Sequence, residues 1–187
     1  MNKIEIRHSI KKQRNRLSST QIEKANKIAT TKVLQHPLFC TSTNIALYMP
    51  VNKEVCLLDI VYEANKQGKK CFIPVINGNS LIFKMLLANT KLIKNKYGIN
   101  EPIDTVAIAT QSLDLVIVPT IAIDKNNNRL GSGGGFYDRT FAFKRRQPEL
   151  KPHLLGISYD FQLIDSIPTK DHDIKCDETI VVTTKQT

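Results

Sequence analysis

Residues 113–135 contain two segments that decide the fold, the apolar run Leu113-Asp114-Leu115-Val116-Ile117-Val118-Pro119 and the cluster Gly131-Ser132-Gly133-Gly134-Gly135. The first has the composition of a buried strand, since it is short, continuous, apolar and closed by proline. The second lies in the loop after that strand. Parallel α/β sheets bind ligands at the carboxyl ends of their strands, so the glycine cluster is expected at a ligand site.

Strand-like and helix-like patterns alternate on both sides of this segment. Apolar runs predict strands over 44–49, 70–75, 80–87, 153–158 and 178–183. Helical patterns cover 3–35 (one helix, or two with a break after Leu17), 54–67, 134–146 and 161–167. Ser19 or Thr20 is expected to cap the second part of the first helix, with Glu23 completing a capping box and Pro37 ending it. Residues 91–100 read as a polar connection.

This alternation predicts an α/β protein, a three-layer α/β/α sandwich with a mainly parallel, Rossmann-like sheet. The length of 187 residues suits one domain over residues 1–187 with a sizeable core. No apolar run approaches the roughly 20 residues that span a bilayer, and residues 1–8 lack a secretory signal. We therefore expect a cytoplasmic protein without a membrane partner.

The glycine cluster carries the clearest chemistry. Four of the protein's eight glycines lie between residues 131 and 135. Without side chains, the backbone can adopt positive φ and its N–H groups can converge on a phosphate, helped by the start of the helix that follows. A flexible turn is the simpler alternative, but Arg129 and Tyr137-Asp138-Arg139 flank the cluster. It matches neither the P-loop nor the dinucleotide fingerprint.

The formal net charge of +10 indicates a basic surface or an anionic partner. Basic residues at spacings of four, four and three share one face of the first helix: Lys3, Arg7, Lys11 and Arg14. A solvated charged face is the usual meaning of such a pattern. The four cysteines and four histidines are scattered, so they propose no zinc site, and buried free thiols are expected.

The loop Asn128-Arg129-Leu130-Gly131-Ser132-Gly133-Gly134-Gly135-Phe136-Tyr137-Asp138-Arg139 resembles the signature of 5-formyltetrahydrofolate cyclo-ligase, also called methenyltetrahydrofolate synthetase. Four further segments resemble the family in the same order. They are Lys3-Ile4-Glu5-Ile6-Arg7, residues 45–55, residues 114–124 and His172-Asp173-Ile174-Lys175-Cys176-Asp177-Glu178.

The resemblance implies an enzyme that converts ATP and 5-formyltetrahydrofolate to 5,10-methenyltetrahydrofolate, ADP and phosphate with Mg²⁺. The formyl oxygen would be phosphorylated before the ring closes. The residues implied to contact ATP are Lys3, Ile4, Glu5, Ile6, Arg7, Arg129, Leu130, Gly131, Ser132, Gly133, Gly134, Gly135, Phe136 and Tyr137. Asp138 and Asp173 would serve the metal, and Met49 and Glu54 the folate, beside part of the glycine loop.

Several of these residues have simpler explanations. Asp138 and Glu54 could each be carboxylates in the first turn of a helix. Tyr48 and Tyr97 could stack on a pterin, although lone aromatic residues usually belong to the core. Phe136 replaces a tyrosine common in the family, which removes one hydroxyl. Cys56 and Leu57 replace a common acidic residue and threonine, so no folate contact is expected from them.

Two other functions compete with this one. A basic nucleic-acid-binding domain could use the same lysines and glycine loop, but aromatic residues make up only 6% and no RNA- or DNA-binding signature is present. Another ATP-dependent enzyme or kinase could share the fold. We expect a monomer that binds ATP and 5-formyltetrahydrofolate, with or without a polyglutamate tail, and no nucleic acid.

Overall fold

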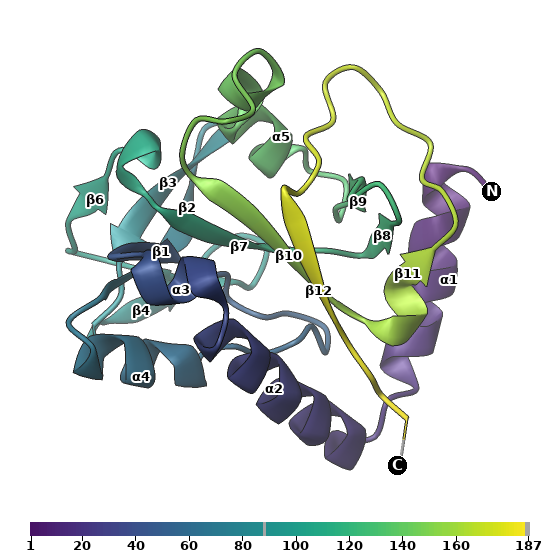
Figure 1. Ribbon diagram of the computed structural model, residues 1–187, viewed down its shortest axis with the longest axis horizontal. Coiled ribbons are helices and arrows are strands. Elements are labelled where there is room, and N and C mark those ends of the chain that lie inside the picture. The colour runs from purple at the N-terminus through teal and green to yellow at the C-terminus, as the bar shows by residue number, and fades with distance from the viewer. Residues whose placement is uncertain (88, 186–187) are drawn as a thin grey trace.

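A seven-stranded sheet forms the centre of the computed structural model, which describes residues 1–87 and 89–185 (Figure 1). Its strand order is β12-β10-β7-β1-β2-β3-β6. The strands are β1 Asn44–Ala46, β2 Lys70–Asn77, β3 Ser80–Met85, β6 Ala107–Ile108, β7 Leu115–Pro119, β10 His153–Tyr159 and β12 Glu178–Val182. Strands β12 to β2 pair in parallel, whereas β2, β3 and β6 are antiparallel. The mainly parallel sheet that the sequence predicted is confirmed.

The central strand β7 is buried on both faces. Leu115 and Ile117 pack into one core cluster with the helices α2 (Ser19–Leu34) and α4 (Asp59–Lys66). Val116 and Val118 pack into a second cluster on the opposite face. This cluster includes Phe141, the residue directly after α5 (Phe136–Thr140). Alternate side chains of one strand thus serve two cores, which is why its sequence is continuously apolar. Figure 1 shows α2 and α4 along one face of the sheet and α5 across the other.

Helix α1 (Lys3–Asn15) lies at the edge of the molecule, beside a small three-stranded sheet (Figure 1). That sheet contains β8 (Ala122–Asp124), β9 (Arg129–Leu130) and β11 (Leu163–Ile164) in the order β11-β8-β9. Ile6 and Ile10, one turn apart on α1, pack against residues of β8 and β9. This packing places the basic helix next to the loop that begins at residue 131, which sequence spacing could not show.

The first helical region is two helices, and its boundaries differ from the prediction. The cap of α2 is Ser18, whose hydroxyl accepts from the Gln21 N–H while the Gln21 side chain bonds the Ser18 N–H. The expected box with Glu23 is therefore wrong by two residues. Helix α2 ends at Leu34, and Pro37 starts the short helix α3 (Pro37–Thr41), because proline fits the first position of a helix.

The helix predicted over 54–67 begins only at Asp59. Residues 50–58 form a loop in which Asn52 and Lys53 both have positive φ. Glu54 is therefore a loop residue rather than a carboxylate in a first helical turn. The Tyr48 hydroxyl donates to the Val55 carbonyl at 2.6 Å, and this bond holds the loop against the core.

Three further segments differ from the sequence prediction. The connection over 91–100 contains an antiparallel pair, β4 (Leu92–Lys94) and β5 (Asn100–Pro102). The helix expected over 134–146 is split into α5 and the 3-10 helix Ala142–Arg145. Residues 161–167 form no α-helix, because Gln162 is buried and donates to the Thr120 and Ile121 carbonyls, and the next two residues pair with β8. The remaining short 3-10 helices are Thr110–Ser112 and Asp160–Gln162.

Candidate functional site

One cleft of about 1720 Å³ brings together segments that are distant in sequence. Its walls come from α1, the loop after β1, the turn between β4 and β5, the glycine loop and residues 168–173. The predicted site residues among its lining are Lys3, Ile4, Arg7, Tyr48, Met49, Glu54, Tyr97, Arg129, Leu130, Gly131, Ser132, Gly133, Gly134, Gly135, Phe136, Tyr137, Asp138 and Asp173. The structure thus collects most of the predicted site in one place.

Two residues of the predicted ATP site lie outside this lining. Glu5 completes a capping box at the start of α1, where its carboxylate accepts from the Asn2 N–H at 2.8 Å. Ile6 is 3% exposed and packs in the core between α1 and β8. Both residues have local structural roles that explain their side chains.

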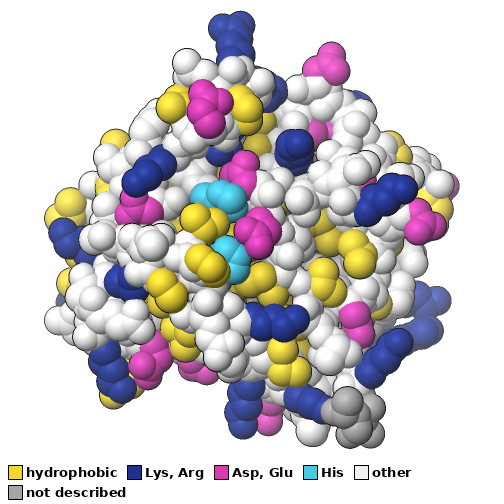
Figure 2. All heavy atoms as spheres, in the orientation of Figure 1, with side chains coloured by type: hydrophobic (Ala, Val, Ile, Leu, Met, Phe, Trp, Pro, Cys, Tyr) yellow, Lys and Arg dark blue, Asp and Glu magenta, His cyan; other side chains and the backbone are white. Residues whose placement is uncertain are grey.

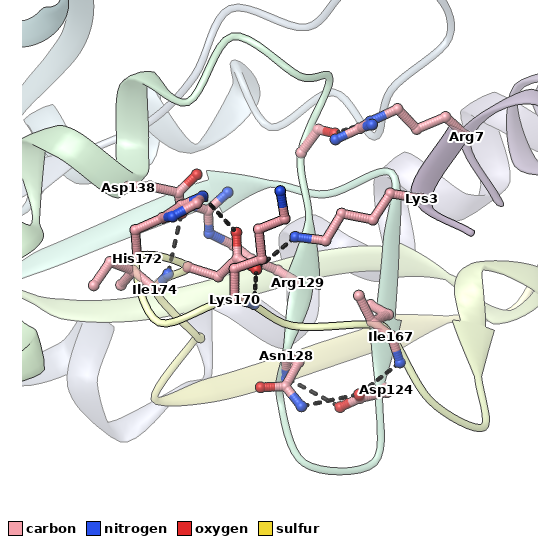
Figure 3. Close-up of polar contacts among 12 residues, drawn as sticks. Lys3, Arg7, Asp124, Asn128, Arg129, Asp138, Ile167, Lys170, His172 and Ile174 are labelled. Carbon is pink, nitrogen blue, oxygen red and sulfur yellow. Dashed lines mark hydrogen bonds and ion pairs between the residues drawn. The ribbon is translucent and has the colours of Figure 1, made fainter. Parts of the chain in front are cut away.

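The glycine loop needs its glycines at defined positions. Gly133 and Gly135 have φ values of 115° and 67°, which side chains disfavour. Arg7 on α1 donates from Nε to the Gly131 carbonyl at 2.8 Å, so helix and loop are directly joined (Figure 3). Helix α5 begins at Phe136 and has only five residues, so it adds a weaker dipole than the longer helix expected from the sequence.

Asp124 holds the turn between β8 and β9, which precedes the glycine loop. Its carboxylate accepts from the N–H groups of Asn126, Asn128 and Ile167 and from the Asn128 amide, at 2.9 to 3.0 Å (Figure 3). Burial opposes ionisation of this carboxyl, but the hydrogen bonds outweigh it and lower the pKa of Asp124. The residue therefore fixes the turn between β8 and β9, a role that sequence reasoning did not assign.

Each of the two predicted metal ligands is paired with a cation. Arg129 Nη2 donates to Asp138 Oδ1 at 2.7 Å, and the same oxygen accepts from the Ile174 N–H. Lys3 Nζ lies 2.5 Å from Asp173 Oδ2. Burial alone would raise the pKa of Asp173, but the bonds from Lys3 and the Lys170 backbone outweigh burial and lower it.

These two carboxylates fit magnesium as it is bound beside phosphates. Within residues 1–87 and 89–185, no group of three His, Cys, Asp or Glu side chains could hold a metal ion by itself. Magnesium needs only one or two carboxylates when phosphate oxygens and water complete its shell. Asp138 and Asp173 both line the cleft, and the hydrogen bonds described above engage only one oxygen of each.

The other end of the cleft is more enclosed. Glu54 Oε2 accepts from the Val51 N–H at 3.1 Å, and Oε1 lies 3.5 Å from Arg14 Nη1. Burial raises the pKa of Glu54, although the Arg14 guanidinium acts against it. Tyr48 is 5% exposed, so most of its ring belongs to the core. Sequence reasoning placed Arg14 on the same helix face as Lys3 and Arg7 but did not assign it to the site.

Two aromatic side chains lie at the rim. Tyr97, from the turn between β4 and β5, is 56% exposed and meets the ring of Phe136 edge-on at 6.2 Å. Asn95 and Glu101 line the cleft from the same hairpin, where Asn95 Nδ2 donates to Glu101 at 2.8 Å. Nothing in the sequence marked these two residues, because only the fold brings the hairpin to the cleft.

Other features of the molecule lie away from the cleft. Figure 2 shows lysine and arginine side chains spread over the face it presents, with carboxylates between them. Cys71 and Cys176 are buried, and burial raises the pKa of their thiols to about 11 and about 12, whereas Cys40 is exposed and Cys56 half-buried. Among the described residues, no helix has both the length and the apolar character to span a membrane.

Comparisons with known proteins identify the family of this chain. The sequence model of the 5-formyltetrahydrofolate cyclo-ligase family matches residues 1–183. The 5-formyltetrahydrofolate cyclo-ligase of Mus musculus is 29% identical over 184 residues, which cover 94% of this chain and 91% of that protein. The 5-formyltetrahydrofolate cyclo-ligase of Haemophilus influenzae is 30% identical over 182 residues, which cover 95% of this chain and 96% of that protein. The solved structure of Aquifex aeolicus 5,10-methenyltetrahydrofolate synthetase matches with a TM-score of 0.83 and 28% identity, covering 100% of this chain and 91% of that one. The chain belongs to the 5-formyltetrahydrofolate cyclo-ligase family.

Proposed function

We propose that the protein catalyses the ATP-dependent cyclisation of 5-formyltetrahydrofolate to 5,10-methenyltetrahydrofolate, with release of ADP and phosphate. The observation that carries this proposal is the polarity of the cleft. One end combines a glycine loop with three basic side chains, and the other end buries the carboxylate of Glu54. The two ends suit a polyphosphate and the amino groups of a pterin, respectively.

The ATP phosphates would lie at the glycine loop. Residues 131–135 offer backbone N–H groups, and Lys3, Arg7 and Arg129 supply positive charge. Phosphoryl transfer depends mainly on positioning and charge neutralisation, which these groups provide. Leu130, Phe136 and Tyr137 would add apolar walls to the same end. A Mg²⁺ ion held by Asp138 and Asp173 would neutralise further charge on the phosphate oxygens.

The folate would occupy the enclosed end. Glu54 would accept hydrogen bonds from ring N–H groups, with Met49 and the edge of Tyr48 against the ring. Tyr97 would cover it from the rim, which its exposure and its contact with Phe136 support. Phe136 packs through its ring alone, so the hydroxyl that a tyrosine would add is not needed for this contact.

The reaction would proceed in two steps. The formyl oxygen attacks the terminal phosphorus of ATP, the bond from that phosphorus to the bridging oxygen breaks, and ADP leaves. The neighbouring folate nitrogen then attacks the activated formyl carbon. The C–O bond breaks, phosphate departs with the former formyl oxygen, and the nitrogen loses its proton to solvent. Phosphorylation converts a poor leaving oxygen into a good one, and the cleft holds both reactants in reach.

The test is growth of the methenyl-folate absorbance when purified protein meets 5-formyltetrahydrofolate, Mg²⁺ and ATP. We expect one ADP and one phosphate per methenyl group, and no signal when ATP is omitted. Glu54→Gln should reduce the rate by raising the KM for the folate, while Glu149→Gln, which changes an exposed carboxylate outside the cleft lining, should leave the rate unchanged. A folded wild-type protein that forms no methenyl product would overturn the proposal.

Three finer points belong to the same proposal. A folate carries a glutamate tail, and the exposed lysines 91, 94 and 96 of the rim hairpin offer positive charge to it, including to a polyglutamate form. A monomer that acts as one catalytic domain over residues 1–187 stays a prediction. Cytoplasmic location, where ATP and reduced folates are available, stays a prediction.

A further inference from the structure

Arg14 is the most deeply buried charged side chain that lines the cleft. It is 2% exposed, although it belongs to a helix whose other basic residues face solvent or the cleft mouth. Its only ion-pair partner among the described residues is Glu54, at 3.5 Å from Nη1. That contact lacks hydrogen-bond geometry, since Nε and Nη1 are both buried without a hydrogen-bond partner.

A buried guanidinium with unpaired donors destabilises the protein unless another group accepts hydrogen bonds from it. An unsatisfied buried donor carries the full penalty of its desolvation, and this penalty is larger when the donor is charged. Arg14 lines the cleft, so a ligand seated against it could receive these hydrogen bonds after a small shift of the guanidinium, whose Nε and Nη1 are otherwise closed to solvent. A merely structural arginine would instead donate to carbonyls of the surrounding loops, as Lys53 does to the Asn15 and Leu17 carbonyls.

The pair formed by Glu54 and Arg14 has a defined chemistry. Glu54 accepts hydrogen bonds, and Arg14 can only donate them. The two lie side by side, so together they fit a ligand edge on which N–H donors adjoin a carbonyl acceptor. The pyrimidinone edge of a pterin has this arrangement, with a 2-amino group and a ring N–H next to the 4-oxo group.

We propose that Arg14 donates to the 4-oxo oxygen of the bound folate and makes the cleft specific for 4-oxo pteridines. This inference rests on the proposed function, since it assigns a contact within the folate end of the cleft. An adenine edge also carries a donor beside an acceptor. However, Arg14 follows Arg7 by two turns of α1, about 10 Å along the helix, so it lies away from the loop proposed for the phosphates.

The test compares two ligands and two variants by calorimetry in the absence of ATP. The ligands are 5-formyltetrahydrofolate and its analogue with a 4-amino group in place of the 4-oxo group. Arg14→Met keeps the aliphatic stem and removes the donors. Arg16→Met is the control, because Arg16 ends the same helix, is exposed and does not line this cleft.

We expect the wild type and Arg16→Met to bind the 4-oxo ligand at least tenfold more tightly than the 4-amino ligand. Arg14→Met should lose at least tenfold affinity for the 4-oxo ligand and less than twofold for the 4-amino ligand. Equal losses for both ligands would mean that Arg14 only supports the fold or Glu54, and would overturn the inference. A loss confined to ATP, measured separately, would overturn it as well.

A second variant keeps the test usable if Arg14→Met does not fold. Arg14→Gln keeps one amide donor without charge, and it should retain a reduced preference for the 4-oxo ligand if Arg14→Met is too unstable to use. No preference in a folded Arg14→Gln protein, together with unchanged affinity for the 4-oxo ligand, would also refute the role of Arg14. If the wild type binds neither folate, the proposed function itself fails, which is a distinguishable result.

Discussion

Arg129→Met would remove the guanidinium that joins β9 to α5, the elements on either side of the glycine loop. Arg129 is 8% exposed, Nη2 donates to Asp138 at 2.7 Å, and its guanidinium lies over the ring of Tyr137 at 5.5 Å. Asp138 in turn accepts from the Ile174 N–H. The variant therefore perturbs both the packing of the cleft and the charge proposed to meet ATP.

The expected loss of stability follows from the burial of the pair. Removing one partner of a fully buried ion pair costs about 3–5 kcal/mol. The Asp138 side chain is 22% exposed and keeps the Ile174 bond, so we expect about 2–3 kcal/mol for Arg129→Met. For a chain of this length, each kcal/mol lowers Tm by about 2–4 °C, which gives a drop of about 4–12 °C.

A double-mutant cycle isolates the pair. Asp138→Asn alone should cost about 1–2 kcal/mol, because the amide still accepts one bond. The double variant should lose less than the sum of the singles, with a coupling of about 1–2 kcal/mol. Urea unfolding measures these values, and calorimetry with ATP should show affinity at least tenfold lower for Arg129→Met. Arg146→Met, an exposed arginine, serves as the control.

A zero coupling energy between residues 129 and 138 would mean that the two side chains do not stabilise the protein as an ion pair. An Arg129→Met protein with the Tm and the ATP affinity of the wild type would refute both roles of Arg129. If Arg129→Met is less stable but binds ATP with unchanged affinity, the ion pair with Asp138 is supported and Arg129 is excluded from the proposed nucleotide site.

Three other changes test neighbouring parts of the site. Lys3→Met should cost about 1–2 kcal/mol, because the Lys3 and Asp173 side chains are only about one-fifth exposed, between the limits of an exposed and a fully buried pair; its ATP affinity should fall at least tenfold in calorimetry, and an unchanged affinity would contradict this. Gly135→Ala should cost about 1–2 kcal/mol in urea unfolding, because φ is 67° and the new Cβ would lie 2.6 Å from an Arg139 nitrogen; an unchanged midpoint would be the contrary result. Asp124→Asn should cost about 2–3 kcal/mol at pH 7, since charge-assisted bonds are lost. The lowered pKa of Asp124 means that its contribution is complete above the unfolded value of about 3.9 and is lost as pH falls towards the folded value. The gap in Tm between wild type and Asp124→Asn should therefore narrow from pH 7 to pH 3, and a constant gap would exclude this linkage.

Local patterns were enough for the parts of the fold that depend on neighbouring residues. The continuously apolar run of β7 predicted a strand buried on both faces, and the structure places its alternate side chains in two cores. The glycine cluster predicted positive φ, which Gly133 and Gly135 have. The resemblance of five ordered segments identified the family, because the order of motifs and their residue types can be read from the sequence without knowledge of contacts.

Tertiary contacts decided the rest, since long-range partners override local preference. The pattern over 161–167 reads as a helix, but Gln162 and its bonds to residues 120 and 121 turn the chain into a strand beside β8. Glu54 lies in a loop because Tyr48 ties the following residue to the core.

The composition of the cleft depended on the fold in the same way. The regular spacing of basic residues on α1 was visible in the sequence, but solvated faces have the same pattern. Only the packing of Ile6 and Ile10 against β8 and β9 turns that face towards the glycine loop and buries Arg14 beside Glu54. Sequence spacing determined which side chains share a helix face, and the long-range burial of apolar side chains determined what that face contacts.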